Sequence, residues 1–327
     1  MKRRDVIKGI GLATAWPLMA RAQQPAMPVV GFLDGRTPEV IANRLRGFHR
    51  GLKETGYVEG ENVRILYRYA ENQDEQLPAL AAELAKRGVA AIVASGGPKV
   101  MSAAKAASST VPVVFLSGED PVRAGLVASL AHPGGNLTGI NFFNRELAAK
   151  QLELLREIVP SAKRIAVFVD PANQRVTEGT LADVEPAARA KGLQIQVVRA
   201  STGGEIDAAF AALSRDRPDA LFFAADPFFA SRRLQLSLLA MRHALPAIYS
   251  NREYAEVGGL ITYGSDITDV YRQAGVYVGR ILKGANPKDM PVAQSVKLEL
   301  IVNTVSARAL GLTVPKSLLV AADEVIE

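Results

Sequence analysis

The feature of this sequence that most constrains its fold is a regular alternation of short apolar runs with longer amphipathic stretches. Residues 28–33 and 90–94 are apolar runs of strand length, and after a turn each is followed by a stretch that opens with a proline, Pro38 or Pro98. Proline is favoured in the first turn of a helix, where its missing N–H is not needed. Strands that alternate with helices pair in parallel. The pattern therefore predicts an α/β fold with an open parallel sheet that helices cover on both faces.

The same pattern begins a second time after residue 163. The apolar run 164–169 ends at Asp170-Pro171, as the first run ends at Asp34-Gly35. The strands expected over the whole chain are 28–33, 63–69, 90–94, 111–116, 164–169, 194–198, 220–224, 247–249, 260–264 and 297–302. The helices expected with defined ends are 77–86, 98–107, 228–243 and 269–283. Two successive units of similar size predict two open parallel-sheet lobes.

The last part of the chain is too short for a third domain, although it still holds two strands and a long helix. These pieces must complete the first two lobes, so the simplest path returns to the first lobe and then crosses back to the second. The path gives a hinge with three crossings, near 138–143, 249–264 and 290–297, with Thr138-Gly139 and Gly258-Gly259 as candidate hinge residues. We expect the N-terminal lobe to hold residues 27–140 and 264–291, and the C-terminal lobe to hold residues 141–263 and 292–327.

The first 22 residues have the organisation of an export signal. Three basic residues, 2–4, precede a short apolar run, 10–20, and Ala20-Arg21-Ala22 has the small-x-small pattern that a signal peptidase cleaves. The apolar run is shorter than the roughly 20 residues that a membrane-spanning helix needs. Arg3-Arg4 before Val6-Ile7-Lys8 also resembles a twin-arginine signal, so both export routes stay open. We expect cleavage near Ala22/Gln23 and a periplasmic protein; an amphipathic N-terminal helix is the alternative.

Composition excludes several classes of protein. The chain contains no cysteine, so it has no disulfide, no thiol nucleophile and no lipid anchor on a processed cysteine. The net charge is +6 at pH 7, but the first 22 residues hold five basic residues and one acidic residue, so the remainder is near +2. That charge gives no basic surface of the size that nucleic acids need. We expect a soluble monomer that binds no nucleic acid.

Six short stretches carry a family resemblance. They are 51–62, 78–81, 120–122, 133–139, 225–229 and 311–315. With them the chain resembles, over nearly its whole length, the ABC-transporter substrate-binding proteins of the type I periplasmic-binding fold, and within these the proteobacterial branch related to tryptophan- and tyrosine-binding components. The resemblance implies that a small solute is captured in the cleft between the lobes and delivered to an inner-membrane ABC permease.

The best local signal for a ligand site is Ser95-Gly96-Gly97-Pro98. It ends a buried strand and begins a helix, so free backbone N–H groups and the positive end of the helix dipole face the edge of the sheet where ligands bind. Such a terminus suits a carboxylate, and Ser95 adds a hydroxyl donor. No Gly-Lys-Ser/Thr follows, so the segment is not a phosphate loop. Ordinary turn chemistry with a helix cap is the alternative.

Polar residues follow other strands at equivalent positions. Those of the first lobe are Asp34, Thr37, Ser117 and Asp120, and those of the second are Asp170, Asn173 and Asp226. A carboxylate in 117–120 is a candidate for a ligand ammonium, and for Thr37, Asp120 and Asp226 a helix N-cap is the alternative. Asp226 is the predicted partner of a ligand ammonium, because a carboxylate that faces a cation is favourable once water is excluded. Phe228 and Tyr249 are candidates for stacking on an aromatic ligand, with core packing as the alternative. We therefore predict that an amino acid or a related carboxylate bridges the lobes and that the hinge closes on it.

The sequence contains no recognisable catalytic or metal-binding arrangement. His49, His132 and His243 are isolated, so we expect no metal. Neither G-x-S-x-G nor, after the first strand, G-x-G-x-x-G is present, so we expect no enzyme and no cofactor. The competing hypothesis is a periplasmic ligand-sensing protein that feeds a membrane receptor, because the same fold serves as the ligand domain of receptors. A periplasmic enzyme is the third.

Overall fold

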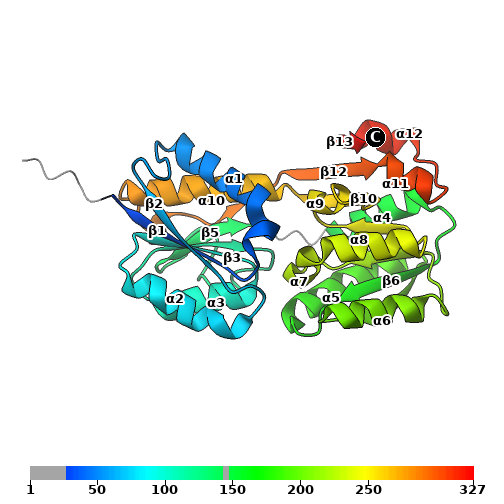
Figure 1. Ribbon diagram of the computed structural model, residues 1–327, viewed down its shortest axis with the longest axis horizontal. Helices are drawn as coiled ribbons and strands as arrows, with labels where there is room; N and C mark the ends of the chain where they lie inside the picture. Colours follow the sequence, from blue (N-terminus) through cyan, green and yellow to red (C-terminus); the bar gives the residue numbers. More distant parts are fainter. Residues whose placement is uncertain (1–26, 143–146) are drawn as a thin grey trace, which may run out of the picture.

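The computed structural model describes residues 27–142 and 147–327, which form two β-sheets side by side, each with its own helices (Figure 1). The predicted signal peptide, residues 1–22, and its cleavage site lie outside the described residues. The strands of the first sheet are all parallel and run in the order β11-β5-β4-β3-β1-β2. Their bounds are Val29–Asp34 (β1), Arg64–Tyr69 (β2), Ala91–Ser95 (β3), Val113–Ser117 (β4), Leu137–Asn141 (β5) and Ala293–Gln294 (β11).

The second sheet runs in the order β13-β12-β10-β9-β8-β6-β7. Its strands are Arg164–Val169 (β6), Gln194–Arg199 (β7), Ala220–Phe223 (β8), Ala247–Tyr249 (β9), Ile261–Ser265 (β10), Leu298–Asn303 (β12) and Glu324–Ile326 (β13). The predicted α/β fold with two open sheets is confirmed, but this sheet is mixed, because β12 is antiparallel to β10. The chain leaves the second sheet at Ser265 and returns at Leu298, its register partner, so the returning strand runs in the opposite direction.

The chain passes between the two sheets three times: after β5, between β10 and α10 (Ile267–Leu282), and between β11 and β12. The lobe boundaries differ from the prediction at all three crossings. β5 continues to Asn141 in the first sheet, and β10 continues to Ser265 in the second. Ala293–Gln294 pairs with β5 in the first sheet. The predicted hinge pairs lie elsewhere, since Thr138-Gly139 is inside β5 and Gly258-Gly259 precedes β10 within the second lobe. The two pairs of small residues therefore lie in a strand and in a turn, and not at a crossing between the lobes.

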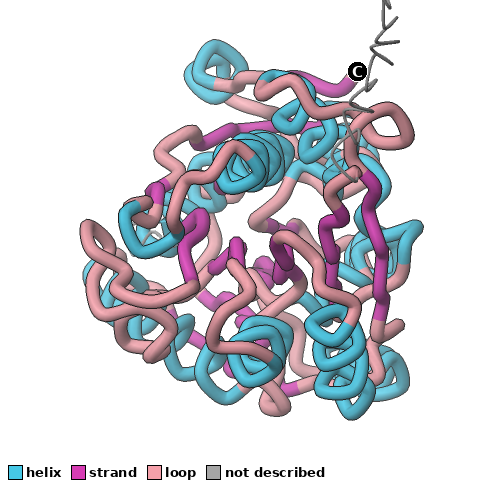
Figure 2. Tube along the Cα trace, turned by 90° about the vertical axis from the view of Figure 1, so that its left-hand side faces the viewer, coloured by secondary structure: helices cyan, strands magenta, loops and turns pink. Residues whose placement is uncertain are grey.

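The first sheet lies between two layers of helices, as Figure 2 shows end-on. Its helices are α1 (Pro38–Glu54) and α10 on one face, and α2 (Leu77–Lys86) and α3 (Pro98–Ala107) on the other. Successive strand residues point to opposite faces. Val30 and Phe32 pack with α1 and α10, whereas Leu33 packs with α2 and α3. Both faces are thus buried, which explains why the strands read as continuous apolar runs.

Helices α1 and α10 pack with their backbones in direct contact (Figure 1). A side chain on Gly51 would overlap the carbonyl oxygen of Arg272, and one on Gly275 would overlap that of Phe48. Glycine at both positions permits this approach. The packing brings Tyr271 of α10 to within 6.4 Å of Phe32, ring centre to ring centre, beside β1.

The helices of the second lobe are shorter and more numerous than predicted. They are α4 (Leu147–Ile158), α5 (Gln174–Ala190), α6 (Gly203–Leu213), α7 (Pro227–Ser231), α8 (Arg233–Arg242), α9 (Arg252–Ala255), α11 (Thr304–Ala309) and α12 (Lys316–Ala321). The single helix predicted over 228–243 is two helices, because Arg232, with φ −103° and ψ 14°, leaves the helical conformation between them. No helix within 27–142 or 147–327 is both long and apolar enough to cross a membrane.

Candidate ligand-binding site

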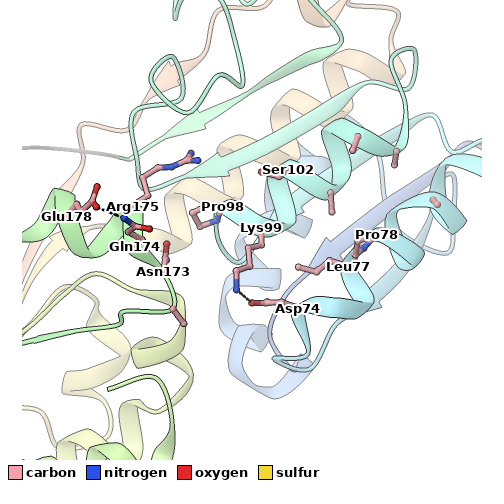
Figure 3. Close-up of a pocket in the computed structure, with 15 residues that line it drawn as sticks. Asp74, Leu77, Pro78, Pro98, Lys99, Ser102, Asn173, Gln174, Arg175 and Glu178 are labelled. Atoms are coloured by element: carbon pink, nitrogen blue, oxygen red, sulfur yellow. Dashed lines mark hydrogen bonds and ion pairs between the residues drawn. The ribbon is translucent and has the colours of Figure 1, made fainter. Parts of the chain in front are cut away.

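Three neighbouring hollows lie between the two lobes. The inner cavity has a volume of ≈ 80 Å³ and the outer cavity one of ≈ 160 Å³; the two share Arg36, Gly96, Gly97, Pro98, Asp226 and Pro227. A groove of ≈ 870 Å³ adjoins the outer cavity and lies between α2 and α3 of the first lobe and the start of α5 of the second (Figure 3). The hollows therefore lead from the groove to the ends of β1, β3 and β4.

A buried ion pair between Asp34 and Arg36 lies beside the inner cavity. The Nε and Nη2 atoms of Arg36 donate to the two carboxylate oxygens of Asp34 at 2.9 and 2.8 Å. Ser95 donates to the same carboxylate at 2.8 Å and also contacts the hydroxyl of Tyr271, to which Arg36 donates at 2.6 Å. Burial lowers the pKa of Arg36, because it disfavours the charged form. The negative charge of Asp34 and its hydrogen bonds raise this pKa, which lies above its usual value. Asp34, predicted to contact the ligand, instead positions the guanidinium that lines the cavity.

The Gly96-Gly97 turn brings the first lobe against the second. Both residues have φ values, +101° and +121°, that residues with side chains rarely adopt. A Cβ on Gly96 would lie 2.7 Å from an oxygen of Asp34, and one on Gly97 would lie 3.1 Å from Pro227 of the second lobe. The N-cap residue of α3 is Gly97, which has no side chain to cap the helix. The predicted carboxylate site is thus an uncapped helix terminus that lines both cavities.

Asp226 lies in the second lobe where the cavities meet. One of its oxygens accepts from the backbone N–H of Phe228 at 2.7 Å, which caps α7, and Asn173 donates to the other at 2.7 Å. Asp170 accepts from the backbone of Ala172 at 2.9 Å and lines the outer cavity with Asn173 and Phe228. Burial raises the pKa of Asp226 to about 6, and the nearby Asp170 carboxylate adds to the shift. Asp226 therefore caps α7 and also lines both cavities.

We expect D226N to gain stability relative to the wild type as the pH rises from 4 to 7, by about 1–3 kcal/mol. An acid whose pKa is raised in the folded state contributes stability below its unfolded pKa and loses it as the pH rises through the folded value, and asparagine does not titrate. Urea unfolding at several pH values measures the difference. The control is Asp219, whose pKa is lowered by backbone N–H groups of Arg164 and Lys163, so D219N should change in the opposite direction. A D226N difference that does not vary with pH would contradict this assignment.

Two ion pairs join the lobes across the inner cavity. Arg44 of α1 and Glu253 of α9 approach to 2.7 Å, and each side chain is only 8% exposed. Burial alone would raise the pKa of Glu253, yet the charge of Arg44 brings it below its usual value. Arg175 of α5 and Glu119, which follows β4, approach to 3.1 Å. These two contacts join residues of the first lobe to residues of the second beside the inner cavity.

Three predicted polar residues do not line either cavity. Ser117 is fully buried, and its hydroxyl donates to the carbonyl oxygen of Glu119 and accepts the N–H of the same residue. Asp120 accepts backbone N–H groups of its own turn, from residues 122 and 123. Thr37 occupies the N-cap position of α1, but its side chain makes no capping hydrogen bond. Turn chemistry accounts for where Ser117 and Asp120 lie.

Tyr249 does not line either cavity, so the predicted stacking position is wrong. Its side chain is 1% exposed and lies between the rings of Phe223 and Tyr254, with ring centres 5.1 and 4.5 Å away. The strand that carries Tyr249 is covered on both faces, so its aromatic side chain packs in the core of the second lobe.

Four side chains at this site are not predicted from the sequence. They are Arg36, Arg44, Glu253 and Tyr271. Arg36 stands in the loop after β1, between two predicted residues, and Glu119 lies in the segment 117–120, where a carboxylate is a candidate for the ligand ammonium. Arg44 had a usable signal, because it shares the apolar face of α1 with Ile41 and Phe48 at helical spacing. A charge on that face needs a buried partner, which the sequence does not identify.

Known proteins share this architecture. A model of the ABC transporter substrate binding protein family matches residues 29–326. The tyrosine-binding protein of Clostridioides difficile (strain R20291) is 28% identical over 269 residues, which are 82% of this chain and 76% of that protein. An ABC domain from Streptococcus pneumonia in complex with L-Trp is 25% identical, with a TM-score of 0.83 over 91% of this chain and 99% of that one. The ligand-free, open structure of a Clostridium difficile substrate-binding protein with adhesive properties is also 25% identical, with a TM-score of 0.68 over 92% and 99%. This chain belongs to the ABC transporter substrate binding protein family.

Proposed function

We propose that this protein is the extracytoplasmic solute-binding component of an ABC importer, and that it encloses an amino acid or a close relative between its lobes by hinge closure. The observation that carries the proposal is the inner cavity. It lies between the two lobes and is lined by charged side chains of both signs, such as Arg36 and Asp226, and by apolar ones, such as Leu116 and Phe142. A zwitterion with an apolar side chain matches that lining.

The relatives support the same ligand class and the same motion. One relative is named for tyrosine, and another was solved with L-Trp. The present structure resembles the Trp complex (TM-score 0.83) more than the open, ligand-free relative (0.68), although both are 25% identical to it. This difference is what a closed arrangement of the lobes would give.

The volumes suggest how such a ligand would lie. The inner cavity holds ≈ 80 Å³, whereas an apolar cavity of about 150 Å³ is known to hold benzene. An aromatic amino acid would therefore extend through both cavities, past Gly96 and Gly97, which line each of them. Its carboxylate would accept from the start of α3, with Ser95 and Arg36 nearby. Phe228 and the polar residues Asp170 and Asn173 would surround the part in the outer cavity.

Delivery to an inner-membrane ABC permease requires export of the protein. The basic residues 2–4 and Ala20-Arg21-Ala22 support cleavage before Gln23. We expect N-terminal sequencing of the protein from the periplasmic fraction to begin at or near Gln23. A full-length chain that stays in the cytoplasm would contradict this part of the proposal.

Small-angle X-ray scattering tests closure. The protein isolated from cells that express the full chain is measured alone and with each L-amino acid that raises its melting temperature. Because a ligand shifts the equilibrium only through differential contacts with the two states, we expect a smaller radius of gyration at saturation. A profile that does not change at saturation would contradict hinge closure.

A further inference from the structure

The acidic side chains around the inner cavity differ in how well their charges are compensated. Asp34 is held by Arg36 in a buried ion pair with two hydrogen bonds. Both oxygens of Asp226 already accept hydrogen bonds, from the N–H of Phe228 and the amide of Asn173. These two carboxylates have the partners that burial requires.

Glu253 is compensated in another way. No residue that the structure describes gives its buried Oε2 atom a hydrogen bond, but its Oε1 atom pairs with Arg44, which is itself only 8% exposed. A buried cation and a buried anion in contact interact strongly, because little water screens them. Glu253 is also not among the residues that line the inner cavity.

Glu119 lines the inner cavity and is the least compensated of these carboxylates. Its side chain is 12% exposed, and none of the residues in 27–142 and 147–327 gives its buried Oε2 atom a hydrogen bond. Its Oε1 atom pairs with Arg175, which is 54% exposed, so water screens that interaction. Burial raises the pKa of Glu119 although Arg175 opposes the rise. A buried carboxylate oxygen without a partner is unfavourable, and a cationic N–H donor would relieve the cost.

A tight turn directly after β4 fixes the backbone position of Glu119 beside the inner cavity. The hydroxyl of Ser117 bonds to both the N–H and the carbonyl oxygen of Glu119, at 3.2 and 2.8 Å, directly after β4. A Cβ on Gly118 would lie 2.8 Å from the ring of Phe142, which lines the same cavity. The tight turn therefore presents the Glu119 carboxylate between the inner cavity and the second lobe.

We propose that Glu119 binds the cationic nitrogen of the ligand and makes the inner cavity selective for ligands that carry a primary ammonium. The proposal rests on the proposed function, and it assigns the ammonium to Glu119 in place of Asp226. One oxygen of Glu119 then accepts from the ligand, while the other pairs with Arg175 of the opposite lobe. Recognition of the ammonium and closure of the lobes are thereby coupled through one carboxylate.

The experiment is a calorimetric titration of the wild type, E119Q, D226N and the control E178Q. Glu178 lies in the groove on α5, where it accepts from Gln174, so E178Q makes the same isosteric change nearby but outside both cavities. The probes are L-tyrosine and L-tryptophan, the amines tyramine and tryptamine, and the carboxylates 3-(4-hydroxyphenyl)propanoate and indole-3-propanoate. Each set keeps the side chain and removes either the carboxylate or the ammonium.

We expect an amino acid to bind the wild type and E178Q equally, and to bind E119Q at least about 30-fold more weakly, because a buried charge pair loses one partner. D226N should weaken binding much less. An amino acid that binds E119Q as tightly as the wild type would overturn the assignment and leave the proposed function in place. A propanoate that binds as tightly as its amino acid would also overturn it. The wild type could bind an amine but no amino acid, and E119Q could fail to bind that amine. This result would support the assignment of the ammonium to Glu119 and contradict the amino-acid function. If none of the six probes binds, the titration is repeated with the amino acid that does bind the wild type, and equal affinity for E119Q overturns the assignment.

Discussion

Replacing Asp34 with asparagine is expected to lower the free energy of unfolding by about 3–5 kcal/mol, because it leaves a buried guanidinium without its counter-charge. Asp34 has no exposed surface, and Arg36 is 4% exposed. Ser95 and Tyr271 also depend on this pair, since both bond to its members. Urea unfolding of D34N and the wild type at pH 7 measures the effect.

The control for D34N is E83Q. Glu83 pairs with Arg68 and Arg87 on the surface, where water screens the charges and such pairs contribute little to stability. The double variant D34N/R36M should recover part of the loss, because it also removes the unpaired charge. A D34N variant that loses no more stability than E83Q would show that the Asp34–Arg36 pair does not hold this part of the first lobe.

Replacing Arg44 with methionine is expected to weaken ligand binding by about 30-fold or more. In the closed arrangement R44M leaves Glu253 buried and unpaired, since Arg44 is the partner of its Oε1 atom. If the lobes open as proposed, the free protein relieves this cost, because α1 and α9 belong to different lobes and opening would expose Glu253 to water. The cost therefore falls on closure and not on folding, so the unfolding free energy should change by less than about 1 kcal/mol. Titration with an amino acid that binds the wild type, together with urea unfolding, measures both quantities.

The matched control for R44M is R46M. Arg46 lies on the same helix but is exposed, so its replacement should change neither affinity nor stability. R44M should also give a larger radius of gyration at equal ligand concentration. Unchanged affinity with a large loss of stability would show that the Arg44–Glu253 pair supports the fold and not closure.

Most of the fold could be predicted because local signals and tertiary packing agree. Helices α2 and α3 begin and end where the sequence indicated, since each has proline in its first turn. The sequence predicts a crossing at 138–143 where the structure has most of β5, because Thr138-Gly139 lies within this strand and glycine weakens a strand signal. The structure shows why glycine stands there: a side chain on Gly139 would overlap the carbonyl oxygen of Phe115 on β4.

The residues of the candidate site that could be predicted are those that directly follow the end of a strand. The predicted residues at the ends of β1, β3 and β6 do gather between the lobes, because parallel strands end at the same edge of a sheet. Tyr271 could not be found in this way, since it reaches Arg36 from 235 positions along the chain through the packing of α10 on α1. Glu253 likewise comes from α9, a single helical turn that no periodicity marks. Contacts between lobes depend on tertiary structure that a sequence pattern does not contain.

The most direct test of amino-acid binding is a calorimetric titration of the exported protein with each of the twenty L-amino acids. We expect one-to-one binding of at least one of them, with a dissociation constant of about 1 µM or lower. The heat-capacity change should be negative, because the cavities bury apolar surface of the ligand. No measurable binding of any amino acid, while an uncharged solute such as a sugar binds with the same stoichiometry, would contradict a zwitterion held between the two lobes.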